Sequence, residues 1–149
     1  MPSCETTHFG CLEYTVSSSL DFIEGLPGFE SERHFVVVQQ PATHPLVFLQ
    51  SIQTPGLCFP ALPVGVVKPG YQPKISDSDQ ELLAFQNQPR IAKDALVLAL
   101  ISVHAEDPTA NLLAPIVVNL GTRVAAQCVD PGMRYSHRYP LAPVIEAAS

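Results

Sequence analysis

The stretch ALVLALISV, residues 95–103, contains the longest apolar run of the chain, Ala95–Ile101. A helix that spans a membrane needs about twenty apolar residues, so this run is too short to be one. It is bounded by polar residues and resembles other β-branched or aromatic runs in the sequence, which are residues 35–38, 46–49, 57–62, 116–118 and 124–129. Residues 11–17, CLEYTVS, alternate apolar and polar side chains as a half-buried strand does. Pro, Gly, Asn and Asp recur between the runs, which predicts a mainly β, antiparallel β-barrel-like or sandwich fold.

Composition supports this fold class. The chain has 149 residues, a length typical of one domain, and 15 prolines, about twice the usual ~5%. Prolines spread from Pro2 to Pro143 exclude a bundle of long helices. One short helix is predicted around residues 77–88, because Ser76 and Asp77 form a capping start and Pro89 would end it. We expect a single domain over residues 1–149, with a frayed tail after Pro143.

The net charge of −6 is concentrated at one end of the sequence. Residues 1–32 contain acidic side chains and no Lys or Arg, whereas acids and bases cancel in the rest of the chain. Nucleic-acid binding requires clustered Lys and Arg, so direct contact with nucleic acid is not expected. A basic protein partner would instead be steered toward the amino-terminal segment.

The first ten residues, MPSCETTHFG, have neither the basic nor the apolar region of a secretory signal. The four cysteines are sparse, and without an export signal they are best interpreted as reduced thiols of a cytoplasmic protein.

Two clusters have residue types used in chemistry. Cys4, His8 and Cys11 offer thiolate and imidazole ligands of the kind zinc prefers, but structural zinc sites need four ligands and the second pair is missing. His104 stands close to Glu106 and Asp107, which suits acid–base work, yet it also ends an apolar strand where polar turn residues are expected. No nucleophile, phosphate-loop or dinucleotide motif accompanies either cluster. The sequence therefore predicts no enzyme, metal or cofactor.

Two further segments combine large apolar side chains with turn residues. They are FIEGLPGFE, residues 22–30, and TANLLAPIVVN, residues 109–119. Each is open to two interpretations, as the core anchor of a tight turn or as an apolar recognition surface.

These two segments, together with VFLQSIQTPGLCF at residues 47–59 and Gln127, resemble the FliW family of flagellar assembly factors. The resemblance covers about residues 8–141. The chain departs from the family pattern at Thr54, where an acidic residue is usual, and in residues 60–70, which are poorer in acids.

The resemblance implies a non-enzymatic cytoplasmic protein with a compact, mostly antiparallel β-barrel-like fold. It implies two partners, flagellin and the RNA-binding repressor CsrA, exchanged in a switch that relieves repression of the flagellin messenger. We expect a monomer that touches neither membrane nor nucleic acid. The side chains expected to contact CsrA are Glu13, Glu24, Glu30 and Glu32, and those expected to contact flagellin are Phe29, Leu112 and Leu113, with Asn111 beside them.

Two alternatives remain at this point. One is a small metal-binding or hydrolytic enzyme built on Cys4, His8 and Cys11, and the other is a generic β-barrel interaction module without the flagellar partners.

Overall fold

The computed structural model describes residues 2–15, 18–104 and 107–141. Its strands are β1 (Ser3–Thr6), β2 (Gly10–Glu13), β3 (Ser19–Phe22), β4 (His34–Gln39), β5 (Val47–Ser51), β6 (Cys58–Pro63), β7 (Ala95–His104), β8 (Asp107–Ala110), β9 (Ile116–Asn119), β10 (Val124–Gln127) and β11 (Tyr139–Pro140). Its helical elements are α1 (Val64–Val67), α2 (Asp77–Leu82) and a 3-10 turn at Pro41–Thr43.

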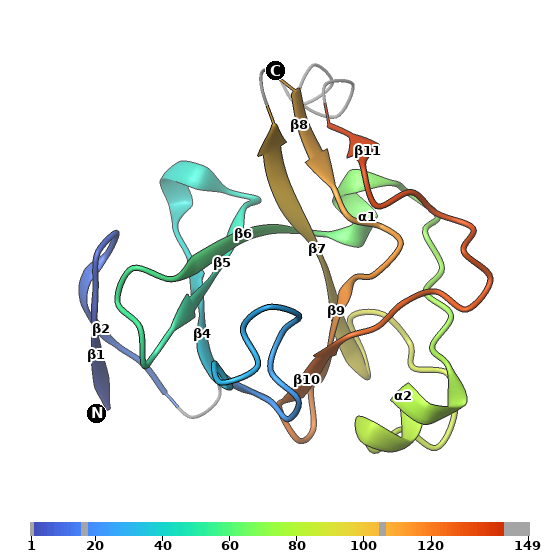
Figure 1. Ribbon diagram of the computed structural model, residues 1–149, viewed down its shortest axis with the longest axis horizontal. Coiled ribbons are helices and arrows are strands. Elements are labelled where there is room, and N and C mark those ends of the chain that lie inside the picture. Colours follow the sequence, from blue (N-terminus) through green and yellow to red (C-terminus); the bar gives the residue numbers. More distant parts are fainter. Residues whose placement is uncertain (1, 16–17, 105–106, 142–149) are drawn as a thin grey trace.

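Seven strands close into a barrel in the order β7-β6-β5-β4-β3-β10-β9, and pairing of β7 with β9 completes the ring (Figure 1). Neighbouring strands are antiparallel except β3 and β10, which run parallel with Asp21 opposite Val124. The sheet continues past β7 into β8 and β11, while β1 and β2 form a separate hairpin. The prediction of a mainly β, antiparallel barrel-like fold is confirmed, and the one parallel pair is an addition to it.

Alternation along the strands fills the barrel and also makes its outer surface apolar. On β4, Phe35 points to the interior, whereas Val36 and Val38 point outward. The buried interior side chains are Leu20, Phe22, Leu26, Phe35, Val47, Leu49, Ala61, Leu98, Ile116, Val118 and Ala125. The barrel interior is therefore a packed hydrophobic core.

Two coverings bury the outer surface. The β1–β2 hairpin packs on Val36, Val38 and Phe48, and a second cluster lies beneath α1, α2 and the chain after β10. Strand β7 contributes Val97 to that outer cluster and Leu98 to the interior. Burial on both faces explains why its sequence is an unbroken apolar run. Within the described residues, no helix has the length and apolar character required to cross a membrane.

Each strand predicted from the sequence overlaps an observed one, although the segment at residues 11–17 yields only β2, and residues 16–17 lie outside the described part. The unpredicted strands are β1, β3, β8 and β11. In β3, Asp21 interrupts the apolar pattern because it faces outward and pairs with Arg33 at 3.0 Å. Strand β8 contains Pro108, a residue that is uncommon in strands and is tolerated here because β8 lies near the edge of the sheet.

The helix predicted at residues 77–88 forms, but the predicted position of its carboxyl end was wrong. Ser76 caps α2 as expected, its Oγ accepting from the Asp79 N–H at 3.2 Å. The helix stops at Leu82, because Ala84 adopts a left-handed conformation with φ 60°, well before Pro89. The other helix, α1, was not predicted, since its sequence VGVV has low helix propensity. The tail predicted to fray after Pro143 lies outside the described residues.

Candidate functional site

The GLPGFE segment forms the loop between β3 and β4 and closes one end of the barrel (Figure 1). Leu26 is 3% exposed and belongs to the interior cluster, so it plugs that end. Phe29 is 39% exposed and rests edge-on against Phe59, with ring centroids 5.4 Å apart. The interpretation as a core anchor therefore holds for Leu26, while Phe29 leaves part of its aromatic ring at the surface.

Gly25 sets the shape of this loop. Its φ is 67°, and a Cβ placed on it would lie 2.5 Å from the backbone of Glu30. Only glycine allows the chain to fold back so closely. Gly25 thereby holds Glu24 and Glu30 on the same side of the loop.

A groove of about 310 Å³ separates this loop from α2. We call it the acidic groove, and its lining is Glu24, Gly25, Pro27, Glu30, Asp79, Leu82, Ala126 and Gln127. Three carboxylates and no Lys or Arg line it, and Pro27, Leu82 and Ala126 supply apolar walls. Glu30 is partly committed, since one of its oxygens accepts from the Gly28 N–H at 3.2 Å. The groove suits a basic side chain with an apolar stem.

Asp79 was missed by sequence reasoning, because it stands far along the chain from the acidic amino-terminal segment. It enters the groove from the first turn of α2, which packs against the strand leading to Cys128. The pKa of the Cys128 thiol is raised to about 12. Burial is the main cause, and the nearby carboxylate of Asp79 is the second. The available signal was the pair of acids in the first turn of α2, Asp77 and Asp79, a position that the helix dipole favours for acids.

The predicted acidic residues do not gather on one surface. Glu24 and Glu30 line the acidic groove, whereas Glu13 is exposed on the β1–β2 hairpin outside it. Glu32 is only 7% exposed, and the Ser51 hydroxyl donates to it at 3.3 Å. The expectation that Glu32 is a surface residue is therefore wrong, because its carboxylate fastens β5 to the loop.

The TANLLAPIVVN segment is largely fixed in the core. Leu112 is completely buried, so the expectation that it is exposed is wrong. Its carbonyl accepts from the Tyr71 hydroxyl at 2.8 Å, and its N–H donates to the Ser136 carbonyl at 3.0 Å. Asn111 caps the turn through Oδ1, which accepts from the Ala114 N–H at 2.9 Å.

Leu113 is half-buried and adjoins an exposed apolar turn. The Leu113 carbonyl accepts from the Asp130 N–H at 2.8 Å, which places the two segments side by side. Val129 is 53% exposed and Met133 is 70% exposed on the turn that follows. We call Leu113, Val129 and Met133 the apolar patch. Sequence reasoning missed Val129 and Met133, because isolated apolar residues in a turn carry no periodic signal.

The acidic groove and the apolar patch are neighbours. Gln127 lines the groove, and its Nε2 donates to the carbonyl of Ala114 at 3.0 Å. Ala114 directly follows Leu113 in the sequence. The two sequence segments singled out above thus meet through Gln127 at one side of the barrel.

The proposed metal cluster does not assemble. In the β1–β2 hairpin Cys4 is opposite Leu12 and Glu5 is opposite Cys11, so the two thiols point to opposite faces. Cys4 is buried, which is the main cause of its raised pKa, and Cys11 is exposed. Among the described residues, no three His, Cys, Asp or Glu side chains are placed to hold a metal ion. Of the proposed acid–base cluster, Glu106 lies outside the described residues.

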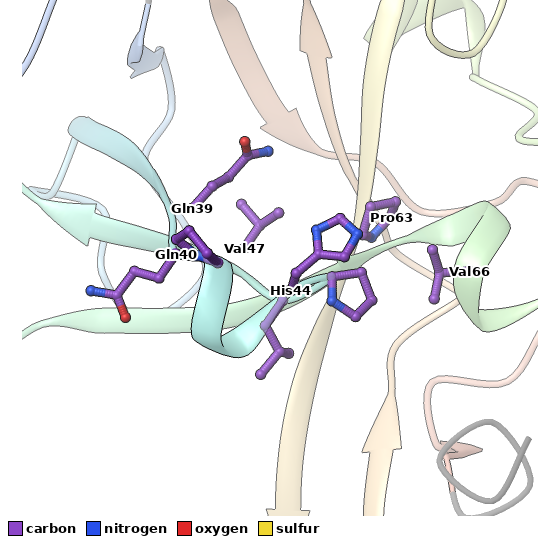
Figure 2. Close-up of a pocket in the computed structure, with 9 residues that line it drawn as sticks. Gln39, Gln40, His44, Val47, Pro63 and Val66 are labelled. Atoms are coloured by element: carbon purple, nitrogen blue, oxygen red, sulfur yellow. The ribbon is translucent and has the colours of Figure 1, made fainter. Parts of the chain in front are cut away.

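A larger hollow, of about 740 Å³, lies between the turn after β4 and the start of α1 (Figure 2). His44, Pro63 and Val66 point toward one another across it, while Gln39 and Val47 stand at its other side. Its lining holds no carboxylate, Lys or Arg. It offers shape and apolar contact but none of the charge of the acidic groove.

Comparison with known proteins gives a consistent result. The profile of the family described as FliW protein matches residues 3–141. A flagellar assembly factor FliW of Bdellovibrio bacteriovorus is 34% identical, over 91% of this chain and 77% of that protein. One of Caldanaerobacter subterraneus is 28% identical, over 96% of this chain and 95% of that protein. A crystal structure of the flagellar assembly factor FliW matches with a TM-score of 0.82 and 31% identity, covering 95% of this chain and 98% of that one.

Proposed function

Because this chain belongs to the FliW family of flagellar assembly factors, we propose that it is a cytoplasmic, non-enzymatic protein that alternates between two partners. One partner is newly made flagellin. The other is CsrA, which it binds when free of flagellin, relieving repression of the flagellin messenger.

The observation that carries the proposal is the acidic groove. CsrA holds RNA phosphates and must present Lys and Arg to do so. Glu24, Glu30 and Asp79 offer three carboxylates to such a surface, and no described base lies in the lining to neutralise them. Opposite charges accelerate encounter and fix the orientation of docking. The groove therefore supports CsrA as the partner that it receives.

The apolar patch supports flagellin as the second partner. The terminal segments of flagellin are apolar helices that await assembly, and they need an apolar surface while they wait. Leu113, Val129 and Met133 provide such contacts beside a fixed turn, in which the buried Asp130 carboxylate accepts from Gly132 and Arg134. Exposed Met is a feature of surfaces that accept varied apolar segments.

The adjacency of the two surfaces supports alternation. Gln127 links the groove to the segment that contains Leu113. A protein bound to one surface therefore also covers residues beside the other surface. Both partners are proteins and the two surfaces are neighbours, so we expect the binding of one partner to exclude the other.

Charge reversal tests the CsrA surface. Titration calorimetry at low and high salt would compare the pair Glu24→Lys and Glu30→Lys with the wild type and with the control Glu13→Lys. We expect the pair to weaken CsrA binding by about 10-fold or more at low salt, and to flatten its salt dependence. The control carries one reversed charge outside the groove and is expected to bind nearly as the wild type does. Unchanged binding by the pair, or equal weakening by the control, would contradict this location.

Polar substitution tests the flagellin surface. Met133→Gln and Val129→Gln are expected to weaken flagellin capture while leaving the melting temperature nearly unchanged, because both side chains are more than half exposed. Val103→Gln is the matched control, since Val103 is 70% exposed and lies where β7 pairs with β8, beyond the closed ring. Loss of flagellin binding with Val103→Gln as well would indicate non-specific hydrophobic contact rather than this patch.

A further inference from the structure

At the end of the barrel opposite the GLPGFE loop, the described residues leave a hollow. Interior-facing side chains near this end line a hollow of about 260 Å³, which we call the barrel mouth. Its apolar wall consists of Leu20, Val37, Leu96, Val118 and Leu120. Ser18, Gln39 and Arg123 complete the lining. The mouths of β-barrels are common places for small ligands to bind.

Arg123 contributes an uncompensated positive charge to the lining. Its backbone is fixed, since its N–H donates to the Asn119 carbonyl at 2.7 Å and its own carbonyl accepts from the Asp21 N–H at 3.0 Å. Its guanidinium forms no ion pair with any residue in the described ranges. The nearby carboxylate of Asp21 is instead held by Arg33, whose Nη2 donates to its two oxygens at 3.0 and 3.1 Å and whose Nε donates to Oδ1 at 3.3 Å. No carboxylate lines the mouth.

Gln39 supplies a hydrogen-bonding group at the same rim. It lies at the end of β4 and lines both the barrel mouth and the larger hollow, beside which Figure 2 shows it. No hydrogen bond joins its amide to another side chain or carbonyl of the described residues. The mouth thus combines an apolar wall with one cation and one free amide.

We propose that the barrel mouth binds a small carboxylic acid with an apolar chain, of the class of short and medium-chain fatty acids. The chain packs against the apolar wall, and the carboxylate pairs with Arg123 and accepts from Gln39. A hollow of about 260 Å³ is smaller than those that hold drug-sized ligands, which favours a short chain. A guanidinium pairs with a carboxylate through strong, charge-assisted hydrogen bonds. This inference does not depend on the flagellar partners.

The test is a chain-length series followed by nuclear magnetic resonance of the full chain. Butanoate, hexanoate, octanoate and decanoate are titrated in turn, with octanol as the uncharged comparison. We expect octanoate to shift the resonances of Leu20, Leu96 and Val118. Affinity should rise about fourfold for each methylene until the hollow is full. Octanol should bind at least about 10-fold more weakly than octanoate.

Two variants and one control test whether the charge of Arg123 and the apolar wall contribute to ligand binding. Arg123→Gln is expected to weaken octanoate binding about 10-fold or more and to leave octanol binding unchanged. Leu120→Ser is expected to weaken the binding of both ligands. Because the Leu120 side chain is 40% exposed, this substitution should leave folding intact. Arg138→Gln is the control, because Arg138 is an exposed arginine outside the mouth. The proposal is overturned if octanoate shifts no resonance of the mouth or if octanol equals octanoate. It is also overturned if Arg138→Gln matches Arg123→Gln, or if only an apolar peptide with a free carboxyl end binds there.

Discussion

Replacing Gly25 by alanine isolates the effect of a single close backbone contact. A left-handed conformation costs a residue with a Cβ about 1–2 kcal/mol, and Gly25 has φ 67°. The added Cβ would also meet the Glu30 backbone at 2.5 Å, and overpacking of this kind costs about 1–3 kcal/mol more. We expect Gly25→Ala to lower the free energy of unfolding by about 2–5 kcal/mol.

Gly28 is the matched control within the same loop. Its φ is 84°, but a Cβ there would meet nothing within 4 Å. Gly28→Ala should therefore lose only the conformational part, about 1–2 kcal/mol. The difference between the two variants reports the contact with Glu30 alone.

The assay is thermal and urea unfolding of both variants, followed by CsrA titration at a temperature where each is folded. For a chain of this size, each kcal/mol lowers Tm by about 2–4 °C. On the proposed function, Gly25→Ala should also weaken CsrA binding, because it displaces Glu30 relative to Glu24. Equal Tm values for the two variants would refute the reasoning about the contact, and unchanged CsrA affinity in a destabilised Gly25→Ala would refute its link to the groove.

Further predictions concern the core and its buried thiol. Leu112→Ala should cost about 2–5 kcal/mol in chemical denaturation, since Leu112 is completely buried, and the half-buried Leu113→Ala clearly less. Tyr71→Phe should cost about 1–3 kcal/mol in the same assay, because it leaves the Leu112 carbonyl buried without its donor at 2.8 Å. Burial raises the pKa of the Cys128 thiol to about 12 in the folded protein, whereas the ordinary value of 9.0 applies to the unfolded chain. As the pH rises, the unfolded chain therefore loses this proton first. Stability should fall between these two pH values, and Cys128→Ala should reduce that loss. Ellman's reagent should modify the exposed Cys11 quickly and Cys128 only on unfolding.

Local patterns predicted most of the barrel strands because each strand carries its own signal. The runs at residues 35–38 and 116–118 are β-branched or aromatic and bounded by turn residues, and both are strands. Closure of the ring by β7 and β9 was beyond such patterns, since pairing depends on residues distant in the sequence. The short strand β3 was not predicted because the polar Asp21 interrupts its apolar pattern. Asp21 faces outward and forms an ion pair with Arg33, which only the fold brings close to it.

The site was predicted in part for similar reasons. Glu24 and Glu30 were identified because they belong to the acidic amino-terminal segment, whereas Asp79 joins them only when α2 lies beside Ala126 and Gln127 in the folded chain. Adjacent leucines in a loop have no period that tells which one is buried, so Leu112 and Leu113 were indistinguishable in the sequence. Tyr71 decides between them by binding the Leu112 carbonyl.

The parallel pairing of β3 with β10 has a consequence for biosynthesis. Asp21 is made early and Val124 late, yet the two must lie opposite each other before the ring is complete. A ribosome adds about 5–20 residues per second, and contacts between distant residues slow folding because the loop between them must first be closed. A nascent chain therefore exposes a half-open sheet for several seconds, and it lacks Gln127 and one wall of the acidic groove throughout that time. On the proposed function, competence to bind a partner through this groove is acquired only at the end of translation, and a product truncated before Gln127 is expected not to compete for that partner.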